Sequence, residues 1–189
     1  PEASDLYERN TLRVVRQVYY SANNKKSIDL VLFLNGLPIA TIELKTESTQ
    51  SVWTAIKQYK KDRLPKDAHS NRIEPLLQFK SRCVVHFAVS TEEVFMTTKL
   101  AGESTYFLPF NKGDNEGKGN PVNPDGPRTA YLWENVLQRD NWLHILSDFV
   151  HLERSEKTDS KGHKTLSERM IFPRYHQWDA VKKLVDTSK

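Results

Sequence analysis

Short apolar runs alternate along the chain with polar breaks rich in glycine and proline, a pattern typical of a mixed α/β domain. The clearest unit spans residues 27–45, where the apolar runs 28–34 and 37–45 flank Asn35 and Gly36. An Asn-Gly pair between apolar runs is the strongest short signal for a β-hairpin. Both runs are apolar on both faces, so we expect them in the middle of a sheet with helices on each side.

Apolar patterns in the rest of the sequence predict further strands up to residue 108 and mainly helices after residue 128. Additional strands are predicted at residues 12–20 (alternatively a helix end running into a strand), 82–90, 94–98 and 105–108. Helices are predicted at residues 51–64, 129–138, 141–152 and 174–186. A loop rich in Gly, Pro and Asn is expected at 111–128, and a charged linker at 153–164. We therefore expect an α/β domain followed by a helical extension.

Composition excludes several classes of protein. The chain has 189 residues, 38% of them hydrophobic, which is enough for a core, and no run approaches the roughly 20 apolar residues of a membrane span. The single Cys83 excludes a disulfide framework or a cysteine-built zinc site and favours a reducing, cytoplasmic setting. No signal peptide opens the chain. Since the first residue is Pro1, we expect a piece of a longer protein.

The net charge of +4 is concentrated in one segment. Residues 54–66 hold five basic residues against one acidic residue, namely Lys57, Lys60, Lys61, Arg63, Lys66 and Asp62. On a helix, Lys57, Lys60 and Lys61 would share one face. Such a stripe suits contacts with phosphate groups, although a solvated helix face would look the same.

Three charged residues interrupt the apolar hairpin: Asp29, Glu43 and Lys45. A charge in a buried strand is costly unless it is paired or bound to a metal ion. Glu43 and Lys45 are two residues apart and point to the same face. Asp29 joins them only if the turn has three residues or a bulge, because a strict two-residue turn would place Asp29 opposite Ile42 and send the carboxylates to opposite faces.

Two carboxylates and a lysine on one face suit metal-dependent hydrolysis of phosphodiesters. The carboxylates are oxygen ligands of the kind that Mg²⁺ prefers. The ion would polarise a phosphoryl oxygen and lower the pKa of its water, while Lys45 would position that water or stabilise developing charge. The alternative is a buried salt bridge between Lys45 and one carboxylate, which would leave the second carboxylate unpaired.

Residues 27–45 resemble the nuclease domain of the restriction (motor) subunit of type I restriction-modification enzymes, which belongs to the PD-(D/E)xK superfamily. The leading Pro of that motif is Ile28 here. The resemblance implies a central mixed sheet flanked by helices, with Asp29 and Glu43 binding Mg²⁺, or Mn²⁺ in its place. It further implies that the main-chain carbonyl of Leu44 is an additional ligand and that Lys45 is the catalytic lysine.

Stretches in the rest of the chain resemble the same family, namely residues 106–113, 119–121, 128–134 and 171–177. The last is similar to the opening of the first helicase-like motor domain, where Gln177 would contact the adenine of ATP. No Gly-x4-Gly-Lys-Ser/Thr motif is present, so stable ATP binding is expected only in the full-length subunit. The resemblance divides the chain into a nuclease core (1–128), a helical extension (129–152), a charged linker (153–170) and the start of the motor (171–189).

One departure concerns the helix after the lysine. Many of these nucleases carry Gln-x-x-x-Tyr there, whereas Gln58 and Tyr59 are adjacent here and about 100° apart on a helix. The residues expected to contact DNA are Lys57, Gln58, Tyr59, Lys60, Lys61 and Arg63. Outside this region, His86 and Trp142 are expected to be core residues and Cys83 to be unreactive.

By resemblance, the function is that of a Mg²⁺-dependent endonuclease domain that cuts double-stranded DNA without a sequence readout of its own. The whole cytoplasmic enzyme would translocate DNA with ATP, while methylation and specificity subunits choose the site. The alternatives are a catalytically silent DNA-binding or docking module of a translocase, or a nuclease of DNA repair or of another defence system.

Overall fold

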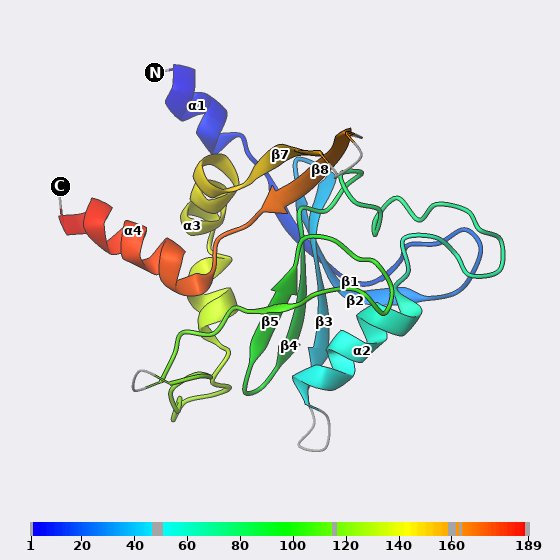
Figure 1. Ribbon diagram of the computed structural model, residues 1–189. Helices are drawn as coiled ribbons and strands as arrows, with labels where there is room; N and C mark the ends of the chain where they lie inside the picture. The colour runs from blue at the N-terminus through cyan, green and yellow to red at the C-terminus, as the bar shows by residue number, and fades with distance from the viewer. Residues whose placement is uncertain (1, 47–50, 115–116, 159–161, 163, 188–189) are drawn as a thin grey trace.

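A six-stranded mixed sheet forms the centre of the protein in the computed structural model, which describes residues 2–46, 51–114, 117–158, 162 and 164–187 (Figure 1). The strands follow one another in chain order across the sheet: β1 (Leu12–Tyr19), β2 (Ser27–Leu34), β3 (Leu37–Lys45), β4 (Val85–Ser90), β5 (Val94–Thr97) and β6 (Leu108–Pro109). Only β3 and β4 are parallel neighbours, and helix α2 (Val52–Asp62) lies between them in sequence. The predicted fold, a mixed sheet with helices on each side, is confirmed.

Helix α2 covers one face of the sheet because its apolar residues recur at helical spacing. Val52, Ala55, Ile56 and Tyr59 are buried and pack with residues such as Leu77 in one core cluster. The helix begins after Ser51 and ends before Arg63, where Pro65 is close enough to stop it. It therefore matches the helix predicted over 51–64.

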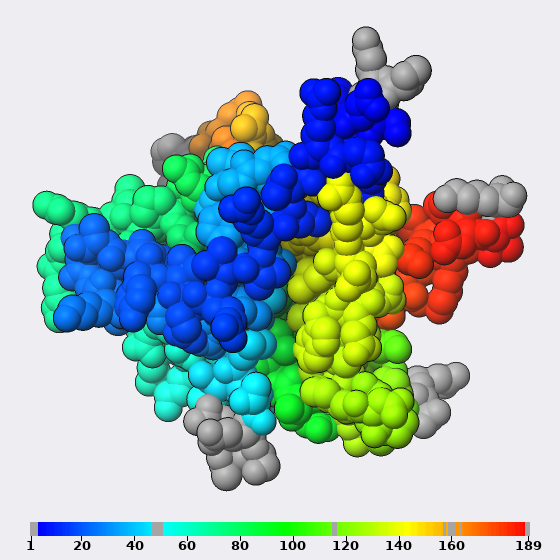
Figure 2. All heavy atoms as spheres, turned by 180° about the vertical axis from the view of Figure 1, so that it is seen from behind, coloured from blue at the N-terminus to red at the C-terminus, as the bar shows by residue number. Residues whose placement is uncertain are grey.

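The opposite face of the sheet carries a larger, aromatic core. It is covered by α3 (Arg139–His144), α4 (Tyr175–Thr187) and the two short π-helical segments η1 (Leu132–Val136) and η2 (Ile145–Phe149). Figure 2 shows the segment from 130 to 150 running beside the strands of the first forty residues. Phe172, Tyr175 and Trp178 are buried in the same cluster as Phe87 of β4. The C-terminal helix thus packs into the core of the sheet, whereas the division of the chain into domains stays a prediction.

Some predicted boundaries were wrong. The strand expected at 82–90 begins at Val85, and most of the strand expected at 105–108 is irregular, with β6 restricted to Leu108–Pro109. The helix expected at 141–152 ends at Phe149. A short helix, α1 (Glu2–Glu8), precedes β1. No described helix is long and apolar enough to cross a membrane.

The charged segment 153–164 was predicted to be a linker without regular structure, and this is wrong for the local structure. Strands β7 (His151–Thr158) and β8 (Lys164–Ile171) pair as an antiparallel hairpin. A continuous ladder from His151–Ile171 to Thr158–Lys164 joins the strands, and exposed ion pairs cross it, namely Arg154–Glu168, Arg169–Glu153 and Lys164–Glu156. Because both faces are polar, the sequence lacks the apolar alternation by which strands are recognised.

A bulge sets the register between β2 and β3. The turn contains only Asn35 and Gly36, since Leu34 pairs with Leu37. Both turn residues have positive φ, +51° and +82°, as a type I′ turn requires. The register then shifts by one residue on the β3 side, where Ile39 is the extra residue.

Beyond the bulge, Leu30 pairs with Ile42. One residue further along the same register, Asp29 lies opposite Glu43. The two carboxylates share a face only if the turn has three residues or a bulge, and the bulged form is present.

The turn gives a test of this register. Replacing Gly36 by Ala should lower the free energy of unfolding by about 1 kcal/mol, because a Cβ disfavours the positive φ. The matched control is Gly126→Ala, at a glycine without positive φ. Urea denaturation measures both, and equal losses for the two variants would contradict the proposed role of the turn conformation.

Candidate functional site

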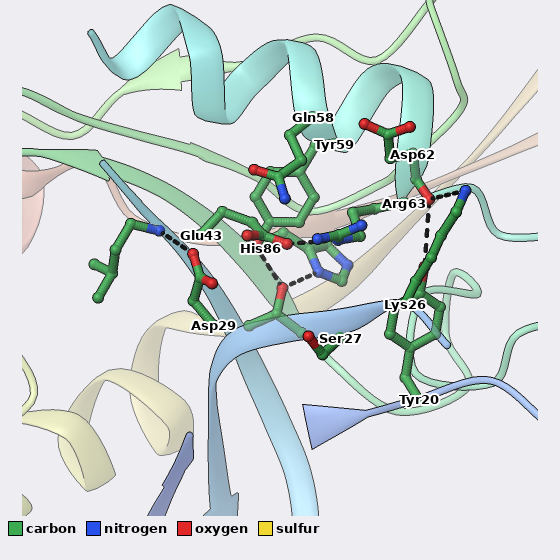
Figure 3. Close-up of polar contacts among 12 residues, drawn as sticks. Tyr20, Lys26, Ser27, Asp29, Glu43, Gln58, Tyr59, Asp62, Arg63 and His86 are labelled. Atoms are coloured by element: carbon green, nitrogen blue, oxygen red, sulfur yellow. Dashed lines mark hydrogen bonds and ion pairs between the residues drawn. The ribbon is translucent and has the colours of Figure 1, made fainter. Parts of the chain in front are cut away.

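The charged residues of the hairpin meet on the face of the sheet that α2 covers. Lys45 of β3 donates a hydrogen bond from Nζ to Oε1 of Gln58 on α2, at 2.7 Å. Glu43, two residues earlier, therefore faces the same helix. Asp29 of β2 lies beside Glu43 in Figure 3, as their shared register position requires. The structure thus brings Asp29, Glu43 and Lys45 together.

Glu43 is fully buried, with 0% of its surface exposed. Its Oε1 accepts a hydrogen bond from Nε of Arg63 at 2.6 Å, and Arg63 is itself only 7% exposed. Its Oε2 is buried and has no hydrogen-bond partner among the described residues. The carboxylate therefore has one neutralised oxygen and one that is left open.

Arg63 is held in place by the end of α2. Its backbone N–H donates to the carbonyl of Gln58 at 3.2 Å. The neighbouring carbonyl of Asp62 accepts hydrogen bonds from Nζ of Lys26 at 3.2 Å and from the hydroxyl of Tyr20 at 3.3 Å (Figure 3). The prediction that Arg63 contacts DNA is therefore corrected: the guanidinium is buried as the counter-ion of Glu43.

Both carboxylate oxygens of Asp29 have a hydrogen-bond donor. The backbone N–H of Leu44 donates to Oδ2 at 2.8 Å, and the side-chain amide of Gln17 donates to Oδ1 at 3.1 Å. Sequence reasoning placed Leu44 at the site through its carbonyl, which stays a prediction, and did not find its N–H. It also missed Gln17, since no local pattern marks that residue.

Gln58 and Tyr59 point in different directions, as their helical spacing implies. Gln58 reaches Lys45, whereas Tyr59 is 0% exposed and its hydroxyl is hydrogen-bonded to that of Thr41 at 2.8 Å. Nδ1 of His86 lies 2.7 Å from the same Thr41 oxygen. The prediction that Tyr59 contacts DNA is corrected, because its side chain is inside the protein. The prediction that His86 is a hydrogen-bonded core residue is confirmed, and burial lowers its pKa to about 3.

The lysines of α2 face outward. Lys57 and Lys61 are exposed and Lys60 is partly exposed, so a contact with DNA stays a prediction for all three. Gln177 lies near the start of α4, on the other side of the sheet, where its Oε1 accepts a hydrogen bond from the backbone N–H of Arg174 at 2.9 Å. Its predicted contact with adenine is not tested by this arrangement.

Comparison with known proteins places the chain in a family. Residues 4–105 match the family model described as type I restriction enzyme R protein N terminus. The chain belongs to this family. It is also similar to "Putative type I restriction enzyme MjaVIIIP endonuclease subunit" of Methanocaldococcus jannaschii, with 24% identity over 190 residues. That match covers 93% of this chain but only 15% of the relative.

In this R-protein N-terminal domain, burial dominates the electrostatics of Glu43. Burial raises the pKa of its carboxyl to about 8, the guanidinium of Arg63 lowers it, and the neighbouring Asp29 raises it further. A second cation beside the open oxygen would favour the ionised form. Among the described residues no group of three or more His, Cys, Asp or Glu could hold a metal ion. Any ion here would need main-chain, water or substrate oxygens besides Asp29 and Glu43.

The raised pKa of Glu43 predicts how stability depends on pH. Between pH 4.5 and about 8 the folded chain keeps a proton that the unfolded chain releases. The bound proton on Glu43 therefore stabilises the folded chain. Its contribution to the free energy of unfolding is complete below pH 4.5 and is lost as the pH rises to about 8. Glu43→Gln should flatten the dependence, measured by urea denaturation without divalent ions.

The exposed Glu103 gives the matched control. Glu103→Gln should keep the dependence of the wild-type chain. A Glu43→Gln variant with an unchanged pH dependence would show that Glu43 has an ordinary pKa.

Proposed function

We propose that this chain is a Mg²⁺-dependent endonuclease domain that hydrolyses phosphodiester bonds of double-stranded DNA. The observation that carries the proposal is the pair of adjacent carboxylates, Asp29 and the fully buried Glu43, whose Oε2 receives no hydrogen bond from an N–H or O–H donor of the described residues. Leaving a buried carboxylate oxygen unpaired costs free energy, which a proton offsets when the site is empty, as the raised pKa of Glu43 reflects, and which a bound cation would offset in its place. The family supports a nuclease, since the relative is described as an endonuclease subunit.

The residues fit a small divalent cation. Asp29 and Glu43 would supply carboxylate oxygens and Leu44 its main-chain carbonyl, which are ligands that suit Mg²⁺ or Mn²⁺. When bound, the ion would supply Lewis acidity, polarising a phosphoryl oxygen and lowering the pKa of a water molecule. The side chain of Asp29 is already fixed by two hydrogen bonds, so little ordering remains when the ion binds.

Lys45 has the role of stabilising charge at the phosphate. Its ammonium group is held by Gln58 on the same face as Glu43. From there it can donate to the attacking water or to the phosphoryl oxygen on which negative charge develops. We infer that Gln58 orients Lys45. It does so without the tyrosine that follows the glutamine by four residues in many of these nucleases.

DNA would approach along α2. Lys57, Lys60 and Lys61 project from the outer side of the helix whose inner side covers the carboxylates. Lysine contacts of this kind address phosphates and carry no sequence information. We therefore infer that the domain cuts without reading sequence.

The family supports a proposal for the wider enzyme. We infer that the domain works in the cytoplasm as part of a type I complex, in which methylation and specificity subunits choose the site. In that complex ATP-driven translocation would bring DNA to the nuclease, with Gln177 contacting adenine in the full-length subunit. The chain spans only 15% of the relative that it matches, and these roles are proposed for the whole protein.

Substitutions in the site should separate metal binding from cleavage. Asp29→Asn and Glu43→Gln should abolish Mn²⁺ binding by this chain, because each removes a charged ligand. Lys45→Ala should leave Mn²⁺ binding in place and abolish DNA cleavage by the complete enzyme. Calorimetric titration with Mn²⁺ and cleavage of plasmid DNA provide the two measurements.

ATP-driven translocation by the complete enzyme is the control, and all three variants should retain it. Wild-type protein that binds no Mn²⁺, or a Lys45→Ala enzyme that still cuts, would overturn the proposed mechanism.

The lysine stripe can be tested without cleavage. Replacing Lys57, Lys60 and Lys61 together by Gln should reduce the slope of log affinity against log salt by about 0.9 for each lost phosphate contact. Titration of a fluorescent duplex with this chain, at several salt concentrations and without divalent ions, measures the slope.

The matched control neutralises three lysines elsewhere, Lys164, Lys182 and Lys183, which lie on the β7–β8 hairpin and on α4. This variant should keep the wild-type slope. Equal effects of the two triple variants would show that net charge, and not a site on α2, governs binding.

A further inference from the structure

A residue of β1 has a backbone conformation that side chains rarely adopt. Gln17 has a φ of +50°, in the left-handed region that a Cβ disfavours. The other non-glycine residues with positive φ among the described part of the chain are Asn35, Asn71 and Lys80, and all three lie outside strands. Within the described strands, strain of this kind is confined to one position.

That position faces Asp29. The β1–β2 ladder keeps the pairs on either side, whereas the pair between Gln17 and Asp29 is missing from it. Because β1 is the edge strand of the sheet, its distortion disturbs no further strand. The regular pairing of β1 with β2 is therefore interrupted at Asp29.

Side-chain hydrogen bonds replace the missing pair. The amide nitrogen of Gln17 donates to Oδ1 of Asp29 at 3.1 Å, and its amide oxygen accepts from the hydroxyl of Ser27 at 2.9 Å. Because an ionised carboxylate only accepts hydrogen bonds, the amide nitrogen faces Asp29 and the amide oxygen is left to accept from Ser27. With Leu44 donating to the second oxygen at 2.8 Å, the orientation of Asp29 is fully determined.

We propose that Gln17 is a positioning residue, whose strained backbone aims its amide at Asp29 and holds that carboxylate in its metal-binding orientation. The inference rests on the proposed function, in which Asp29 is a metal ligand. Glycine would adopt this backbone conformation without strain. The conformation alone would therefore favour glycine at position 17, and the glutamine side chain needs another explanation. Partners that orient ligands govern metal affinity, and strained residues gather where function requires them.

The test compares Mn²⁺ binding with thermal stability in the 189-residue chain. Gln17→Gly removes the amide and relieves the strain, so it should weaken Mn²⁺ binding about tenfold without lowering Tm. Gln17→Met keeps the side-chain length and the strain but cannot donate, and it should weaken binding to a similar extent. The matched control, Asn71→Gly, changes another residue of positive φ and should leave Mn²⁺ affinity unchanged.

Two outcomes separate this inference from the proposed function. If Asp29→Asn loses Mn²⁺ binding while Gln17→Gly and Gln17→Met keep wild-type affinity, the positioning role is overturned and the metal site stands. If the wild-type chain binds no Mn²⁺, both are overturned. A fall in Tm with unchanged affinity would assign Gln17 a structural role only.

Discussion

The burial of the Glu43 carboxylate constrains the arrangement of the whole site. A carboxylate that is removed from water needs an opposite charge nearby, and here Arg63 supplies it from the end of a different element. That pairing is made only when α2 ends at one position above the sheet. The apolar face of the helix and the hydrogen bonds to the carbonyl of Asp62 favour the same position. Packing and electrostatics therefore specify one structure together.

The two faces of the sheet have different tasks. On the side away from α2, Phe87 of β4 packs edge to face against Phe110, which follows β6, and against Phe172 of the C-terminal segment. Contacts of this kind provide much of the apolar burial that stabilises a domain. The face under α2 has a smaller apolar cluster and carries the costly groups, Glu43 and Arg63. Burial of apolar surface in the larger core can offset the free-energy cost of burying the charged groups of Glu43 and Arg63.

Asp29 is controlled by irregular backbone on both sides of β2. On the β3 side, the bulge at Ile39 shifts the register so that Asp29 lies opposite Glu43. On the β1 side, the left-handed conformation of Gln17 replaces a ladder pair by a side-chain contact. Regular strands would have stabilised the sheet more evenly, but the regular two-residue hairpin would have separated the carboxylates. The irregular positions are thus those at which the orientation of a carboxylate matters.

The sequence by itself determined the hairpin, α2, the core position of His86 and the shared face of Glu43 and Lys45, because these follow from local periodicity and turn residues. Only the bulge at Ile39 decided that Asp29 joins that face. Tyr59 was predicted to contact DNA although it lies on the apolar stripe of α2 with Val52 and Ile56. The contact of Gln58 with Lys45 could not be predicted, since it joins α2 to β3. The β7–β8 hairpin was not predicted either, because its strands are polar and lack apolar alternation. Only the tertiary structure decided that Arg63 would neutralise Glu43 and that Gln17 would hold Asp29. Such contacts join residues from separate elements, and local sequence patterns do not record the distance between elements in space.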